Sequence, residues 1–127
     1  MFKDSQPFSG FAVKDIAEAK TFYGQTLGLE VSEDPDRGLD LHLPGGLNVF
    51  IYPKPDFEPA TYTILNFQVP DIDVAVSALA AAGVEMQRYP GLDADAHGIV
   101  RDPRGPMIAW FKDPAGNILS VLQDNSR

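Results

Sequence analysis

Asp40 and His42 are the pair of residues in this sequence that best fits acid–base chemistry. They alternate with leucines in the segment LDLHL, a pattern typical of a half-buried strand, so both side chains should point to the same face. A carboxylate can hold an imidazole in one tautomer, which would make His42 a base and Asp40 its orienter. Such a pair also occurs on ordinary, partly exposed strands, and both interpretations stay open.

Ser120, Asn66 and Trp110 are further candidates for a binding site. Ser120 interrupts the apolar strand NILSVLQ. No pattern typical of a catalytic triad surrounds it, so we interpret it as a small residue lining a site and not as a nucleophile. Asn66 in TILNFQV could bind a ligand carbonyl or a neighbouring strand. Trp110 in MIAWFK could be a stacking platform or a core residue.

The segment PGLDADAHGIVRDPRGP, residues 90–106, is the irregular stretch that looks most functional. Its length of about 17 residues exceeds that of a typical connection, and such loops are often lids. It carries His97, Arg101 and Arg104 in an otherwise acidic chain. Arg101 could fold over a site and bind a carboxylate or phosphate through two N–H groups. The alternative is an exposed, mobile loop with solvated charges.

The elements that must position these residues form an internal repeat. VKDI at 13–16 matches VPDI at 69–72, and LGLEV at 27–31 matches AGVEM at 82–86. In each half a strand leads into a helix, and three more strands follow the helix. The N-caps of the two helices are predicted at Asp15 and Asp71, and each helix should stop at a glycine, Gly28 or Gly83. Each half therefore reads as a βαβββ module of an α+β protein. The two modules are separated by a proline-rich linker at 53–60.

The repeat, the stretch FYGQTLGLEV and the hairpin FKDPAGNILSVLQ resemble the vicinal-oxygen-chelate superfamily. That group includes glyoxalase I, extradiol dioxygenases, and fosfomycin- and bleomycin-resistance proteins. The resemblance implies a single domain, residues 1–127, in which two tandem βαβββ modules form a curved mixed sheet around a cleft. Module 1 would span about residues 8–52, and module 2 about residues 61–123.

The resemblance also implies where a metal would bind in metal-using members. One His and one Glu come from each module, and the matching positions here are Phe8, Phe50 (or Ile51 after a one-residue slip), Ile64 and Ser120. Phenylalanine and isoleucine offer no donor atom, and a lone serine hydroxyl is a poor ligand for a divalent transition metal. We therefore expect neither a metal nor another cofactor.

Strand alternation then predicts a mostly apolar cleft with a few polar groups, which is the usual make-up of a small-molecule site. The favoured hypothesis is a metal-free protein that sequesters a small apolar or aromatic compound. The alternative is a lyase, isomerase or dioxygenase with an atypical site, whose catalytic residues stay unknown. The predicted ligand-binding residues are Phe8, Asp40, His42, Phe50, Tyr52, Ile64, Asn66, Trp110, Ser120 and Arg101.

Composition limits the partners. The 127 residues include 18 acidic and 10 basic residues, for a net charge of −8, which disfavours binding to nucleic acid. There is no cysteine, which suits a reducing compartment. The sequence shows no signal peptide and no apolar run long enough to span a membrane. We expect a cytoplasmic protein, and the resemblance implies a homodimer.

Overall fold

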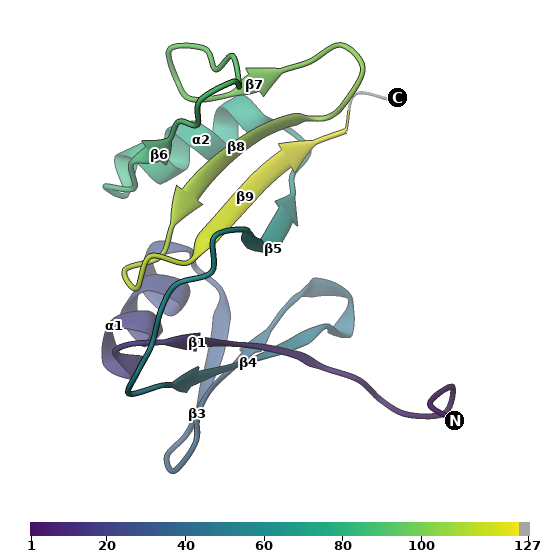
Figure 1. Ribbon diagram of the computed structural model, residues 1–127, viewed down its shortest axis with the longest axis vertical. Coiled ribbons are helices and arrows are strands. Elements are labelled where there is room, and N and C mark those ends of the chain that lie inside the picture. The colour runs from purple at the N-terminus through teal and green to yellow at the C-terminus, as the bar shows by residue number, and fades with distance from the viewer. Residues whose placement is uncertain (125–127) are drawn as a thin grey trace. The chain divides into compact units, whose positions relative to one another are not determined.

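The computed structural model describes residues 1–124, and the chain divides into two compact units, Met1–Glu58 and the part that starts at Pro59 (Figure 1). The boundary falls inside the proline-rich segment 53–60. Among the described residues, no helix is long and apolar enough to cross a membrane.

Unit 1 is a mixed four-stranded sheet with a helix on one face. The strand order is β1-β4-β3-β2, in which β1 and β4 run parallel and the other neighbours are antiparallel. Asp15 caps the helix, because its carboxylate accepts the amide of Glu18 at 3.2 Å. The elements are β1 (Ser9–Val13), α1 (Ile16–Thr21), the π-helical η1 (Phe22–Thr26), β2 (Glu30–Asp34), β3 (Gly38–His42), the short η2 (Pro44–Gly46) and β4 (Asn48–Pro53).

The core of unit 1 lies between the sheet and α1. Leu39 and Leu41 of β3 and Ile51 of β4 are at most 1% exposed, and Tyr23 of η1 is fully buried. Burying one such aliphatic side chain contributes about 1.5–3 kcal/mol. The alternating residues of these strands therefore lie on the opposite face of the sheet.

Unit 2 repeats this topology. Its strand order is β5-β9-β8-β6, with β5 parallel to β9, and the short β7 pairs with β8 next to β6. The carboxylate of Asp71 caps α2 by accepting the amides of Asp73 and Val74, at 3.0 and 3.2 Å. The elements are β5 (Thr63–Gln68), α2 (Ile72–Ala81), β6 (Met86–Gln87), β7 (Val100–Arg101), β8 (Met107–Lys112) and β9 (Ile118–Gln123).

The turn between β8 and β9 explains the DP-x-GN motif. The Asp113 carboxylate accepts the backbone amide of Asn117 at 2.8 Å and its side-chain amide at 3.1 Å, and both residues are buried. Gly116 adopts φ +97°, a conformation that favours glycine. The motif therefore fixes the hairpin that carries Trp110 and Ser120.

The α+β class and the two βαβββ modules are confirmed, with two differences from expectation. The strands form two hydrogen-bonded sheets, one in each unit, where the resemblance implied a single curved sheet. The long 90–106 loop also contains β7, which extends the edge of the unit 2 sheet.

Gly38 tests the packing of β3 against β4. A Cβ at Gly38 would lie 1.9 Å from the carbonyl oxygen of Ile51, whereas a Cβ at Gly45 would meet nothing within 4 Å. Both glycines have positive φ, so both Gly→Ala variants carry backbone strain, and only Gly38→Ala adds a clash. We expect Gly38→Ala to lower the free energy of unfolding by at least about 2 kcal/mol more than Gly45→Ala. Urea unfolding measures both, and equal losses would contradict this packing.

Candidate functional site

The predicted site residues of unit 1 lie mostly on the sheet face opposite α1. We call Ser32, Asp40, His42, Asn48, Phe50 and Tyr52 the polar–aromatic face. Asp40 is the cross-strand partner of Phe50, and the rings of Phe50 and Tyr52 stack with centroids 6.0 Å apart and planes 17° apart. Phe8 does not join this strand pairing, because β1 begins at Ser9 and Phe8 is 70% exposed. The face thus offers an aromatic pair beside a half-buried carboxylate.

His42 is held through both ring nitrogens, and neither partner is Asp40. Nε2 lies 2.7 Å from Oγ of Ser32, and Nδ1 lies 3.2 Å from Oδ1 of Asn48. An amide oxygen can only accept, so Nδ1 carries the proton in this arrangement, and a neutral His42 accepts the Ser32 hydroxyl proton at Nε2. The expected orienter, Asp40, is thereby replaced by Asn48.

Ser32 and Asn48 were not among the sequence-predicted site residues. They reach His42 because β2 and β4 flank β3, and Asn48 is the direct cross-strand partner of His42. The signal that could have found them is the register of these three strands. That register places Leu41 of β3 between Val31 of β2 and Val49 of β4, so that apolar residues of the three strands lie side by side.

Three of the predicted residues of unit 2, Asn66, Trp110 and Ser120, lie on the sheet face opposite α2. We call Thr63, Asn66, Gln87, Trp110 and Ser120 the tryptophan face. Ser120 stands between its cross-strand partners Asn66 and Trp110, is fully buried, and donates its hydroxyl proton to Oδ1 of Asn66 at 2.5 Å. Because this bond uses the hydroxyl proton, the arrangement fits a lining residue and not a nucleophile.

A β-bulge in β5 changes which residue accompanies Trp110. Thr63 pairs with Ile118, but Leu65 pairs with Leu119, so Ile64 is the extra residue. A bulge shifts the alternation of side chains by one position. Thr63 therefore joins the tryptophan face, where its Oγ1 accepts the indole N–H of Trp110 at 3.1 Å. Thr63 thus takes the place on this face that strand alternation predicted for Ile64.

Tyr89 adds a second ring to the tryptophan face. Its ring meets that of Trp110 edge to face, with centroids 5.7 Å apart and planes at 88°. Burial raises the pKa of the Tyr89 hydroxyl, so it stays protonated at neutral pH. Tyr89 was not among the predicted site residues, and its only signal in the sequence is its place two residues after Gln87, the cross-strand partner of Trp110.

Arg101 lies on the other side of the unit 2 sheet. In β7 it pairs with Met107. Side chains alternate along β8, so Met107 is on the same face as the buried residues Ala109 and Phe111, which is the face toward α2. Its guanidinium binds two carboxylates, Asp73 at 2.6 Å and Asp95 at 3.0 Å. This placement corrects the expectation that Arg101 folds over the predicted site, because the ion pairs hold it beside α2.

Asp95 organises the turn that precedes β7. Its Oδ1 accepts the amides of His97 and Ile99 at 2.9 and 3.0 Å, and its Oδ2 accepts Arg101 Nε. Burial alone would raise the pKa of Asp95, but hydrogen bonds from the Ile99 amide, the Arg101 guanidinium and the His97 amide outweigh burial and lower the pKa below its usual value. The Asp95 carboxylate therefore fixes this part of the predicted lid through three hydrogen bonds.

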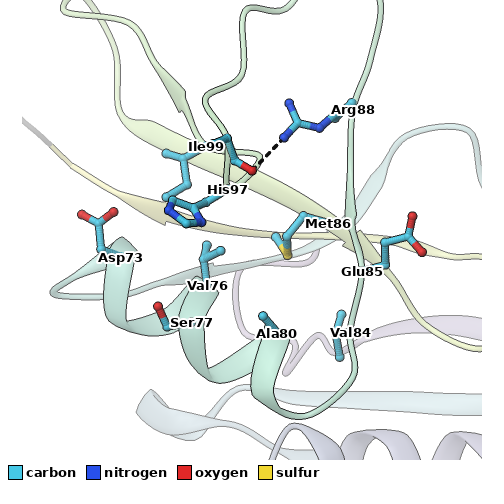
Figure 2. Close-up of a pocket in the computed structure, with 11 residues that line it drawn as sticks. Asp73, Val76, Ser77, Ala80, Val84, Glu85, Met86, Arg88, His97 and Ile99 are labelled. Atoms are coloured by element: carbon cyan, nitrogen blue, oxygen red, sulfur yellow. Dashed lines mark hydrogen bonds between the residues drawn. The ribbon is translucent and has the colours of Figure 1, made fainter.

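A cavity of about 700 Å³ lies on the α2 side of unit 2 (Figure 2). Figure 2 shows His97 above α2 and Arg88 reaching the turn, where its guanidinium is 3.1 Å from the carbonyl oxygen of Ala96. Met86 faces this cavity and pairs with Phe111, whereas the next residue, Gln87, pairs with Trp110. The cavity and the tryptophan face are thus on opposite sides of β6. The lining residues are Asp73, Val76, Ser77, Ala80, Val84, Glu85, Met86, Arg88, Ala96, His97 and Ile99.

The residues at the family's metal positions do not fit a transition metal. Phe8, Phe50 and Ile64 carry no donor atom, and the Ser120 hydroxyl is bonded to Asn66. Within residues 1–124 no cluster of three or more His, Asp or Glu side chains could hold a metal ion. The chemistry available at the two faces is therefore that of aromatic rings, hydroxyls, amides, one imidazole and the Asp40 carboxylate.

The hydrogen bonds of Asp95 predict that its contribution to stability depends on pH. Asp95→Asn keeps an acceptor for the His97 and Ile99 amides but loses the charge that pairs with Arg101. We expect it to lower the free energy of unfolding by about 1 kcal/mol at pH 7, as for a partly exposed ion pair. Because the folded-state pKa is depressed, this difference should be complete above about pH 4 and should shrink as pH falls further.

Urea unfolding of both proteins from pH 7 to pH 3 measures this difference. Asp93→Asn is the matched control, since it makes the same change at an exposed position of the same loop. A gap between the parent protein and Asp95→Asn that does not change with pH would contradict the proposed role of the Asp95 charge.

Comparison with known proteins places the chain in a family. Residues 8–121 match the Glyoxalase/Bleomycin resistance protein/Dioxygenase superfamily. No curated protein matches the chain. A glyoxalase family protein from Enterococcus faecalis is similar in structure, with 25% identity, a TM-score of 0.67, and coverage of 96% of this chain and 99% of that one.

Two further solved structures share the fold at lower identity. TnmS3, an antibiotic binding protein from Streptomyces sp. CB03234, has 21% identity, a TM-score of 0.69, and coverage of 94% of this chain and 97% of that one. Lactoylglutathione lyase from Agrobacterium tumefaciens has 19% identity, a TM-score of 0.68, and coverage of 94% and 93%. With the match over nearly its whole length, the chain belongs to the glyoxalase/bleomycin resistance protein/dioxygenase superfamily.

Proposed function

We propose that this protein binds a small apolar or aromatic compound without a metal and sequesters it. The observation that carries the proposal is the chemistry of the family's metal positions, where two phenylalanines, an isoleucine and a hydrogen-bonded serine replace donor side chains. A protein with these residues keeps the shape of the fold and loses the Lewis-acid chemistry of metal-using members.

The tryptophan face is the best-formed part of this binding surface. Trp110 is half-buried, and its indole is fixed by the bond to Thr63 and by the edge of Tyr89. Fixed aromatic rings with a few polar groups are typical of small-molecule sites. Similarity to TnmS3, an antibiotic binding protein, supports binding without naming a ligand for this chain.

The metal-free part of the proposal has a direct test. We expect purified protein to contain no stoichiometric transition metal, and its melting temperature to stay unchanged when nickel, zinc or manganese is added, because no converging donors are available. Elemental analysis and thermal unfolding measure both quantities. About one bound metal ion per chain would overturn this part of the proposal.

The binding part predicts a ligand-dependent gain in stability. Small aromatic compounds that bind should raise the melting temperature of the parent protein, because they bind only the folded state. Trp110→Ala should abolish the rise. Tyr62→Ala, which removes a 70% exposed aromatic ring from the same unit, should retain it. Equal responses of the two variants would show that Trp110 is not part of the site.

His42 favours a second candidate function, an enzyme that moves protons. Its hydrogen bonds to Ser32 and Asn48 fix one tautomer, with Nε2 as the proton acceptor. Exchange of solvent deuterium into a bound compound, lost in His42→Gln, would favour this enzyme over a pure binding protein. A compound recovered without exchange or other change favours binding alone.

We also propose that two copies of the chain associate in the cytoplasm. The edge strands β2 and β6 leave unpaired backbone groups that association could cover. Light scattering distinguishes a dimer from the 13.8 kDa monomer.

A further inference from the structure

The hydroxyl of Tyr89 is the one buried side-chain nitrogen or oxygen in residues 1–124 that has no hydrogen-bond partner. Buried polar groups are almost always hydrogen-bonded, since desolvation without a partner is unfavourable. The ring of Tyr89 is in a favourable contact, because it packs edge to face on Trp110. The lone hydroxyl therefore needs an explanation in terms of what it binds.

Polar groups of the tryptophan face are paired with one another. The indole N–H of Trp110 is donated to Thr63, and the Ser120 hydroxyl is donated to Asn66. These two bonds use the indole N–H of Trp110 and the hydroxyl proton of its cross-strand partner Ser120. Beside the fixed rings of the tryptophan face, the Tyr89 hydroxyl is thus the buried side-chain group of residues 1–124 that has no hydrogen-bond partner.

We infer that the Tyr89 hydroxyl is the polar anchor of the ligand site and donates a hydrogen bond to an acceptor oxygen on a flat, neutral, aromatic ligand bound beside Trp110. The inference rests on the proposed function and specifies the class of ligand. Such a ligand is an aryl ketone or a similar aromatic carbonyl compound. Its ring packs against Trp110, and its carbonyl oxygen meets Tyr89.

The direction of the hydrogen bond follows from the state of the hydroxyl. Burial keeps Tyr89 protonated, so it donates to a carbonyl readily. A neutral ligand fits better than an anionic one, because the chain carries a net charge of −8 and Arg101 is paired with Asp73 and Asp95 on the other side of the sheet. Neutral acceptors are therefore favoured over carboxylates and phosphates.

Two probes of nearly the same planar shape isolate the hydrogen bond. Acetophenone carries a carbonyl group where α-methylstyrene carries a methylene group. Trp110 is the only tryptophan of the chain, so its indole N–H gives a single proton NMR resonance that reports on binding at this face. We expect the parent protein to bind acetophenone at least about fivefold more tightly than α-methylstyrene, as one hydrogen bond to an otherwise unpaired buried group would give.

Tyr89→Phe should remove this preference and leave α-methylstyrene binding unchanged. The same variant should not lower the melting temperature of the ligand-free protein, because the hydroxyl has no internal partner to lose. Tyr62→Phe, which removes the hydroxyl of an exposed tyrosine, is the matched control and should keep the preference. Loss of preference without loss of stability is a result that a merely structural role for the hydroxyl would not produce.

The outcomes separate this inference from the proposed function. If both probes shift the indole resonance and bind the parent protein equally well, the role of Tyr89 is overturned and small-molecule binding at this face stands. If neither probe shifts the resonance, both are overturned for the tryptophan face. A clear fall in the melting temperature of Tyr89→Phe would reveal an internal partner and would also overturn the inference.

Discussion

The parallel pairing of the first and last strands in each unit is the constraint on which the other features depend. β1 pairs with β4 and β5 pairs with β9, and each pair joins segments about 40–60 residues apart in sequence. A parallel pair needs a long crossover, and here each crossover includes the helix that covers one face of the sheet. Once this register is set, alternation decides which side chains face the helix and which are available for binding.

Local sequence signals were sufficient for the framework but not for the partners of the site residues. The repeat, the helix caps at Asp15 and Asp71, and the alternating strands could be predicted because each depends on residues close together in the chain. The bulge at Ile64 could not, since a bulge is defined by the count of residues on the partner strand. It moved Thr63 into the position expected for Ile64 and gave Trp110 its hydrogen-bond acceptor.

The same limit applies to the charged and ionisable residues. Asp40 is close to His42 in sequence, yet the imidazole binds Ser32 and Asn48 from the two flanking strands. Arg101 lies in a loop rich in charge, but the pairing of β7 with β8 turns it toward two carboxylates on the α2 side. In both cases strand pairing selected the partner, and no pattern within a single segment records that pairing.

One row of cross-strand neighbours in each sheet, with one residue from each of four strands, shows how the same topology supports different chemistry. In unit 1 the row is Gly10, Phe50, Asp40 and Ser32, and in unit 2 it is Asn66, Ser120, Trp110 and Gln87. The large ring stands on the last strand in unit 1 and on the neighbouring strand in unit 2. A Cβ at Gly10 would already lie 3.2 Å from the carbonyl oxygen of Phe50, so the first row has little room to grow beside its aromatic residue.

This exchange of large and small residues bears on the positions where metal-using members carry carboxylates. Phe50 and Ser120 occupy equivalent places in the two rows, and they also match the two carboxylate positions of metal-using members. In unit 1 a ring fills the position, and in unit 2 a buried hydroxyl is committed to Asn66. Restoring one carboxylate would bury a charge without a metal or a partner, which is costly. Each single reversal is therefore expected to lower the stability of its own unit.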